Sequence, residues 1–161
     1  MKFRIEEDSL GKVRVPRNAL WGAQTQRAID NFPISGISMN FPFTNTFISM
    51  LGYVKDAAAR ANKNLKLLEA KKQRVISRAA KEVWTNKHGK EFPIDVFQTG
   101  SGTSTNMNAN EVIANLCFKT SKIKIHPNDD VNMSQSSNDV IPTVMNPVSY
   151  THLTLPTIMP V

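Results

Sequence analysis

The chain has 161 residues and a formal charge of +7, and 40% of its residues are hydrophobic. Because a typical domain has about 150 residues, a chain of this length is expected to form one compact core. All apolar runs are short, which excludes a membrane-spanning helix, and the charged start Met1–Asp8 is unlike a secretory signal. The single cysteine, Cys117, excludes an internal disulfide and a cysteine-rich zinc site. We therefore expect a single domain from the reducing cytoplasm.

Much of the positive charge lies between Lys63 and Lys90. Such a stretch can bind nucleic acid, because phosphates attract Lys and Arg. Its pattern is that of a solvated helix, however, with Trp84 as its only large aromatic residue and no recognised nucleic-acid module beside it. We expect no nucleic-acid partner, and a non-catalytic helical interaction or nucleic-acid-binding module stays the alternative.

The first predicted elements are a hairpin and a short helix. Residues 3–15 alternate imperfectly in hydrophobicity around a central turn and predict a small β-hairpin that ends at Pro16. Residues 19–32 have a helical pattern, which Pro33 closes because the residue before a proline is pushed out of the α region. Residues 33–43 then form a loop punctuated by proline and glycine.

Three longer helices are predicted next, over residues 44–65, 68–86 and 106–118, from apolar residues that recur every three or four positions. We expect a mainly α fold with a β-hairpin at its start. The predicted buried side chains are Phe47, Leu51, Val54, Ala58 and Ala61 in the first helix, Val75, Ile76, Ala79 and Val83 in the second, and Met107, Val112, Ile113 and Leu116 in the third.

The first of two polar clusters surrounds Gly100 and Gly102, where a loop meets a helix. Glycine permits positive φ, so the hydroxyls of Ser101 and Thr103 would lie beside unpaired backbone N–H groups at the helix start. That arrangement suits a carboxylate, since a helix N-terminus carries partial positive charge. No Walker lysine follows, so a nucleotide phosphate fits poorly. Plain capping by Thr103 or Thr105 is the alternative explanation.

The second polar cluster runs from His126 to Asp139 and is dense in uncharged hydrogen-bond donors, which can bind a carboxylate without a local cation. Pro142 indicates a helix that starts close after Ser137-Asn138. A lone His126 beside two acids is a weak signal for zinc, which needs several spaced ligands. Helix capping, Asx turns and a surface histidine are the plainer explanation.

The two clusters and the segment 108–115 between them closely resemble the N-terminal part of class II fumarases, in the fumarase/aspartase superfamily. Aspartases, the nearest alternative, tend to have Ala in place of Ser101 and Thr in place of Ser137, so both residues favour a fumarase over an aspartate ammonia-lyase. The resemblance continues without a break to about residue 145. In the opening segment it includes Arg4–Asp8, Gly11, Val15-Pro16 and Trp21–Ala28.

The resemblance implies a fumarate hydratase, which adds water reversibly to fumarate to give (S)-malate in the tricarboxylic acid cycle. It implies a cytoplasmic homotetramer that uses no metal or organic cofactor and has no nucleic-acid or membrane partner. It places the catalytic histidine, the catalytic serine loop and the central helical bundle outside this chain, so we assign no catalytic residue here.

The resemblance also assigns two groups of binding residues in this chain. The expected substrate-binding residues are Ser101, Gly102, Thr103, Ser136, Ser137 and Asn138. The expected residues of a second, peripheral anion site are His126, Pro127, Asn128 and Asp129. The chain departs from the family pattern at Asp130, where His is frequent, at Leu116-Cys117, where Arg-Ala is common, and at Ile141, where an aromatic residue is usual.

Residues 147–161 differ from the rest of the chain, because they contain no Asp, Glu, Lys or Arg and show no helical period. Val148–Thr157 closely resembles the peptide encoded by a transposon adapter used in sequencing libraries. We therefore predict a fumarate lyase N-terminal domain at residues 1–146 of an incomplete enzyme, followed by a non-native tail. An ordinary proline-rich tail is the alternative. His152 lies in this tail and matches no family motif, so it is given no role.

Overall fold

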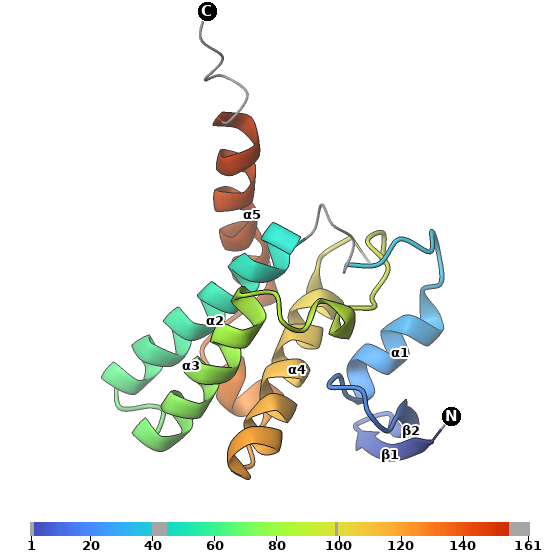
Figure 1. Ribbon diagram of the computed structural model, residues 1–161, viewed down its shortest axis with the longest axis horizontal. Helices are drawn as coiled ribbons and strands as arrows, with labels where there is room; N and C mark the ends of the chain where they lie inside the picture. Colours follow the sequence, from blue (N-terminus) through green and yellow to red (C-terminus); the bar gives the residue numbers. More distant parts are fainter. Residues whose placement is uncertain (1, 40–44, 99, 155–161) are drawn as a thin grey trace, which may run out of the picture.

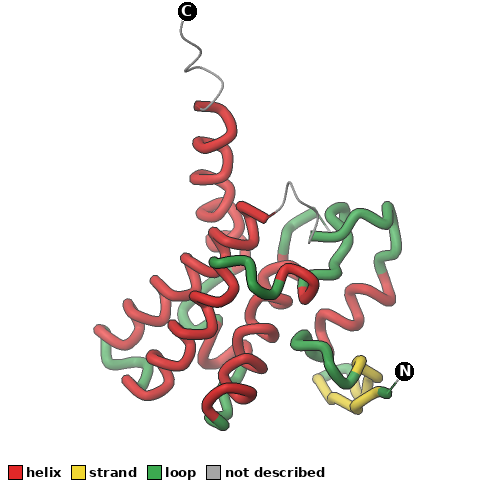
Figure 2. Tube along the Cα trace, viewed as in Figure 1, coloured by secondary structure: helices red, strands yellow, loops and turns green. Residues whose placement is uncertain are grey.

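The computed structural model describes residues 2–39, 45–98 and 100–154, without the side chains of residues 151–154 (Figure 1). A two-stranded antiparallel hairpin is followed by helices, as Figure 2 shows, which confirms the predicted fold class. The elements are β1 (Phe3–Asp8), β2 (Gly11–Pro16), α1 (Ala23–Asn31), α2 (Asn45–Asn64), α3 (Ala70–Trp84), the 3₁₀ helix η2 (Gly89–Glu91), α4 (Thr103–Ser121), the π-helix η3 (Pro127–Val131) and α5 (Ser137–Thr154).

The hairpin is held against α1 by an ion pair. The predicted hairpin is confirmed, and its register runs from Phe3 opposite Pro16 to Asp8 opposite Gly11. Arg27 of α1 donates from Nε to Oδ2 of Asp8 at 2.8 Å, and this bond lowers the pKa of Asp8. The β-hairpin is therefore fixed on the helical part of the chain although it buries few apolar side chains.

A carboxylate joins the start of α1 to α4. Glu111 of α4 is buried and accepts hydrogen bonds from the backbone N–H groups of Gly22, Gln24 and Thr25 at 2.8 to 3.1 Å. A helix N-terminus has unpaired N–H groups and partial positive charge, so one carboxylate satisfies both requirements.

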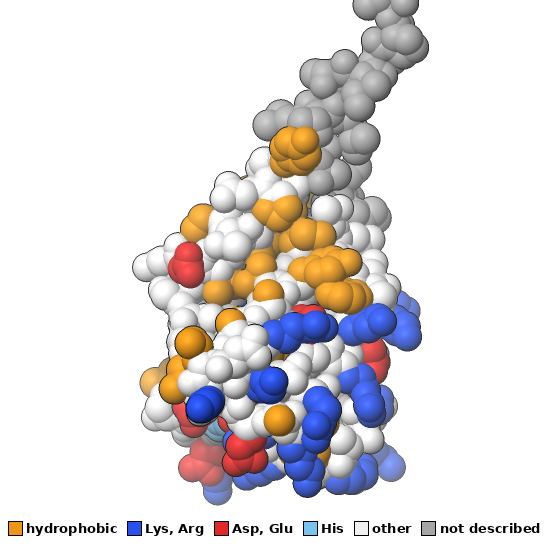
Figure 3. Space-filling model, turned by 90° about the vertical axis from the view of Figure 1, so that its left-hand side faces the viewer, with side chains coloured by type: hydrophobic (Ala, Val, Ile, Leu, Met, Phe, Trp, Pro, Cys, Tyr) orange, Lys and Arg blue, Asp and Glu red, His pale blue; other side chains and the backbone are white. Residues whose placement is uncertain are grey.

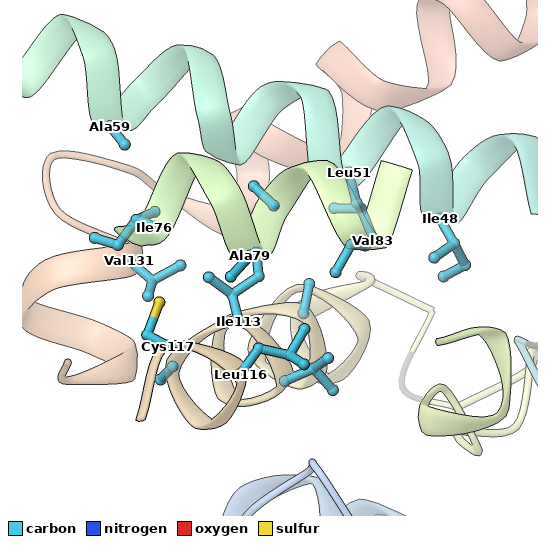
Figure 4. Packing of buried hydrophobic residues seen from close by; sticks show 14 of the residues in the cluster. Ile48, Leu51, Ala59, Ile76, Ala79, Val83, Ile113, Leu116, Cys117 and Val131 are labelled. Carbon is cyan, nitrogen blue, oxygen red and sulfur yellow. The ribbon is translucent and has the colours of Figure 1, made fainter. Parts of the chain in front are cut away.

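The core lies where α2, α3 and α4 pack together (Figure 4). Gly52 allows α2 to approach α3 closely, because a Cβ added there would lie 2.7 Å from the backbone nitrogen of Trp84. The predicted buried face of α3 is confirmed at Ile76, Ala79 and Val83, and Val75 is half-buried. Labelled core residues in Figure 4 are Ile48, Leu51, Ala59, Ile76, Ala79, Val83, Ile113, Leu116, Cys117 and Val131.

The predicted buried face of α2 is confirmed only in part, with Phe47 and Val54 packed against the core from its edge. Leu51 is buried as expected, but Ala61 is exposed, and Phe47, Val54 and Ala58 are only half-buried. The helix also buries three polar or charged residues, Lys55, Asp56 and Asn62, which the apolar period did not indicate. The residues that α2 buries are Ile48, Leu51, Gly52, Lys55, Asp56, Ala59 and Asn62.

The bounds of the last two helices also differ from the prediction. Helix α4 begins at Thr103 rather than at Asn106, and Met107 is only half-buried. Helix α5 contains both Pro142 and Pro147 and runs to Thr154, so the absence of a helical pattern after residue 146 did not mark its end. A proline removes one N–H donor but leaves the neighbouring helical bonds available. The side chain of His152 and residues 155–161 lie outside the described part, and the origin of the tail stays a prediction.

Apolar and basic side chains occupy different parts of the face seen in Figure 3. Apolar side chains gather in the upper part of the described surface, and most Lys and Arg side chains lie in its lower part, with some Asp and Glu among them. A groove between α2 and α5 is lined by Val54, Ala58, Leu65 and Val140, among others. Among the described helices, none combines the length and the hydropathy that a bilayer crossing requires.

Candidate functional site

The loop before α4 has the backbone conformation that its glycines predict. Gly100 and Gly102 have φ values of +72° and +73°, and Gly102 is the N-cap residue immediately before α4. Gly102 has no side chain and so cannot itself cap the helix, while capping by Thr103 or Thr105 stays the alternative. The N-terminus of α4 has N–H groups of the kind that an anion could use.

A close contact brings the first polar cluster to α5. A Cβ added to Gly102 would lie 2.8 Å from Cγ1 of Ile141, so only glycine fits between the loop and the second turn of α5. Ile141, which departs from the family's aromatic residue, forms this contact. A second link is the hydrogen bond from Nδ2 of Asn106 to Oγ of Ser137, at 2.9 Å. Through these contacts the two predicted clusters lie side by side.

The polar side chains at this junction are open to solvent. Ser101 and Thr103 are exposed, with their hydroxyl oxygens 3.1 Å apart. Ser136 and Asn138 are also exposed, and the backbone N–H of Asn138 donates to Oγ of Ser136 at 3.2 Å. Ser137 is half-buried at the first position of α5. Two helix starts with several hydroxyl groups thus lie together, and helix starts and hydroxyl groups are features that suit a carboxylate.

A buried lysine lies behind the second cluster. Lys55 of α2 is fully buried, and its Nζ donates to Oδ1 of Asn132 and to Oε1 of Gln135, each at 2.9 Å. Burial lowers the pKa of Lys55 from 10.5 to about 7, because a charged amine is poorly solvated inside the protein. The side-chain amide of Asn62 donates to the backbone oxygen of Met133 in the same segment. Sequence reasoning missed this lysine.

Asn132 connects Lys55 to α4. Its Oδ1 also accepts from the side-chain amides of Asn106 at 3.1 Å and Asn110 at 3.2 Å. Both asparagines are fully buried near the N-terminal end of α4, within the helix that the sequence predicts over residues 106–118. Their spacing of one helical turn was the available signal that they share a face.

The second anion site is predicted around η3. His126 accepts a hydrogen bond at Nδ1 from the backbone N–H of Asp129, at 3.1 Å, and so caps this short helix. The side chains of His126, Asn128 and Asp129 are exposed, and Pro127 is half-buried. The structure brings these four residues together, while their role in binding an anion stays a prediction.

Asp130, where the family frequently has His, anchors this segment. It is buried and accepts from the backbone N–H of His126 at 2.9 Å and from Nζ of Lys72 at 2.7 Å. The hydrogen bond to Asp130 raises the pKa of Lys72. Acidic residues dominate the neighbouring cleft, whose charged lining residues are Glu6, Glu7, Asp8, Glu111 and Lys124. This chain by itself therefore gives the second site little positive charge.

Comparisons with known proteins show which family the chain belongs to. A family described as lyase matches residues 11–157. The chain belongs to this lyase family. The match extends into the segment predicted to be a non-native tail, without testing the origin of that segment.

The lyase chain is similar to curated fumarate hydratases of class II. That of Xylella fastidiosa (strain Temecula1) is 56% identical over 144 residues, which are 89% of this chain and 30% of that protein. That of Mycobacterium tuberculosis (strain H37Rv) is 56% identical over 141 residues, covering 88% and 29%. The resemblance to class II fumarases is thereby confirmed.

Solved structures show the same fold. A fumarate lyase:delta crystallin from Brucella melitensis superposes with a TM-score of 0.88 at 42% identity, covering 93% of this chain and 36% of that one. A class II fumarase from Schistosoma mansoni gives a TM-score of 0.83 at 39% identity, covering 91% and 32%. The lyase chain thus spans about a third of the length of these relatives.

In this lyase chain, the described residues include no group of three or more His, Cys, Asp or Glu side chains that could hold a metal ion. Burial raises the pKa of the Cys117 thiol to about 12, which makes it a poor nucleophile. The side chains at the junction of the two clusters carry hydroxyl and amide groups.

Proposed function

We propose that this chain is the N-terminal part, residues 1–146, of a class II fumarate hydratase. The enzyme hydrates fumarate reversibly to (S)-malate in the tricarboxylic acid cycle, as a cytoplasmic homotetramer. The observation that carries the proposal is the 56% identity to proteins named fumarate hydratase class II, over nearly all of this chain. The junction of the two polar clusters supports it, since the substrate of such an enzyme is a dicarboxylate.

The proposed role of this junction is to stabilise negative charge. In the malate direction the enzyme removes a weakly acidic carbon proton beside a carboxylate, and a second negative charge develops on that carboxylate. Donors that point at it lower the barrier, and the loss of one such donor typically costs about 2.7 to 4 kcal/mol. The donors proposed here are Ser101, Thr103, Ser136, Ser137 and Asn138, with Gly102 allowing close approach of the backbone.

The proton-transferring histidine and the base, a serine on a mobile loop, are proposed to lie outside this chain. We therefore expect the 161-residue chain alone to hydrate no fumarate. We further propose that His126, Pro127, Asn128 and Asp129 bind a second anion in the complete enzyme, where residues of other segments would add positive charge.

The test is a product assay by proton NMR on the complete protein encoded by the gene. With fumarate in water, malate is expected, and with fumarate plus ammonium, no aspartate. Aspartate formed only with ammonium would identify an aspartate ammonia-lyase instead. Neither product from folded, complete protein would contradict both assignments. A Ser137→Ala variant is the matched control, because loss of a binding donor must slow the reaction if this site is used.

A further inference from the structure

Asn106 contacts Ser137 from inside the protein. It is fully buried on α4, and its side-chain N–H₂ donates to Oγ of Ser137 at 2.9 Å and to Oδ1 of Asn132 at 3.1 Å. Within the described part of the chain, its own Oδ1 has no hydrogen-bond partner. A buried polar atom without a partner typically costs about 1 to 3 kcal/mol. The surroundings must therefore impose this orientation of the amide.

The imposed orientation originates at Lys55. Nζ of Lys55 donates to Oδ1 of Asn132 at 2.9 Å, so Asn132 presents its oxygen to the amine. The Nδ2 of Asn132 donates to the backbone carbonyl of Gln135 at 3.2 Å, which fixes the same orientation from the other side. Asn132 thus presents its oxygen to Asn106 as well. If the Asn106 amide were rotated by 180°, its Oδ1 would face Oδ1 of Asn132, and the two oxygen atoms would repel each other.

This orientation determines what the Ser137 hydroxyl can do. A serine hydroxyl has one proton to donate and two lone pairs that accept. Asn106 occupies a lone pair and offers no acceptor to Ser137, so the serine proton is left to point elsewhere. Among the bonds of the described residues, none uses that proton. A carboxylate only accepts, so a serine committed to donating is suited to bind one.

We infer that Asn106 is a positioning residue for the proposed dicarboxylate site. Its amide, oriented by Lys55 through Asn132, makes Ser137 present its proton to a substrate carboxylate. The inference rests on the proposed function, because it requires Ser137 to contact the substrate. Asn106 itself lies beneath the site and acts only through Ser137.

The test measures binding of succinate, a dicarboxylate that cannot be hydrated, to the complete protein by titration calorimetry. Asn106→Leu removes the donor at similar volume, and we expect it to weaken binding about tenfold. In a Ser137→Ala background the same change should weaken binding by at most about twofold, because residues that act through one another are not additive. Equal loss in both backgrounds would overturn the inference, as would no loss from Asn106→Leu alone.

Asn110→Leu is the matched control. Asn110 is also fully buried on α4, donates to the same Oδ1 of Asn132, and has an unpaired Oδ1, but no bond joins it to Ser137. We expect Asn110→Leu to lower the free energy of unfolding about as much as Asn106→Leu does. Its affinity for succinate should stay within about twofold of that of the unmodified protein. If it weakens binding as much as Asn106→Leu does, general packing explains both results and the inference fails.

A second variant covers the case in which Asn106→Leu does not fold. Lys55→Met removes the group that orients Asn132, and its effect on succinate binding should again disappear in the Ser137→Ala background. An effect that persists there contradicts the inference. Complete protein that folds but binds no succinate would instead contradict the proposed function, so the two failures are distinct.

Discussion

The loop before α4 and the segment before α5 supply neighbouring parts of one site, yet they are built differently. In the loop, Gly100 and Gly102 determine the backbone, and the hydroxyl groups of Ser101 and Thr103 contact each other in solvent. In the segment, buried side chains from α2 and α4 hold residues 132–137 from behind.

The difference shows two ways of orienting a donor. A loop of glycines presents backbone N–H groups and relies on conformations that other residues rarely adopt. The segment before α5 presents side chains, and buried amides set the direction in which those side chains donate. The first design should be sensitive to any added Cβ, and the second to the loss of a single buried hydrogen-bonding group.

The largest expected effect concerns the buried amine behind the second segment. Because the pKa of Lys55 is lowered to about 7, the unfolded state binds more protons than the folded state between about pH 7 and 10.5. The free energy of unfolding, relative to Lys55→Met, should therefore rise with pH in this window by up to about 1.4 kcal/mol per pH unit. Below pH 7 the difference should be flat. Urea unfolding of both complete proteins measures it, and a flat difference throughout the window would show that the amine is solvated.

Gly102→Ala should disrupt the loop by a smaller but still large amount. The positive φ costs a non-glycine residue roughly 1 to 2 kcal/mol, and the contact with Ile141 adds overpacking of about 1 to 3 kcal/mol. We expect a loss of about 2 to 4 kcal/mol in urea unfolding.

Gly100→Ala is the control for the contact. Gly100 has nearly the same φ, but no atom lies within 4 Å of an added Cβ, so the loss should be only about 1 to 2 kcal/mol. Equal losses at the two glycines would mean that the approach of Ile141 does not constrain the loop.

Lys72→Met tests the anchor of the second anion site. Its ion pair with Asp130 is partly exposed, so we expect a destabilisation of about 1 kcal/mol or less. Because the pKa of Lys72 is raised, the contribution is present below the ordinary lysine pKa and is lost as the pH rises through the raised value. Double-mutant analysis with Asp130→Asn checks the coupling, and additive effects would exclude it.

Lys71→Met should have the smallest effect. Lys71 is exposed on the basic face of α3, and surface changes of this kind usually stay within about 0.5 kcal/mol. It removes the same charge as Lys72→Met. A thermal unfolding midpoint that fell as far as that of Lys72→Met would attribute the effect to net charge rather than to Asp130.

Sequence reasoning predicted the parts of the fold that follow a regular pattern. The hairpin, the three long helices and the positive φ at Gly100 and Gly102 could be predicted, because alternation, helical period and glycine chemistry are local signals. The burial of polar residues on α2 could not. From the sequence alone, polar residues such as Lys55 and Asn62 are expected to face solvent. Their burial is favourable because they donate hydrogen bonds to residues in the segment before α5, more than 70 positions away.

The site, like the fold, could be predicted only where the signal is local in the sequence. The candidate hydroxyl groups could be named from two dense polar clusters and a family resemblance, but the residues behind them could not. Asn106 looked like one more polar residue at a helix start, and its direction of hydrogen bonding depends on Asn132 and Lys55. Which residues support a site is a property of contacts between distant segments, and no local period encodes it.

The most direct test of the account is a crystal structure of the complete protein with bound succinate. The account predicts one carboxylate within hydrogen-bond distance, about 2.7 to 3.1 Å, of donors from both clusters. These are Ser101 or Thr103 at the start of α4, and Ser137 or Asn138 at the start of α5. A succinate bound elsewhere, or held by only one of the two clusters, would contradict the claim that their junction is the dicarboxylate site.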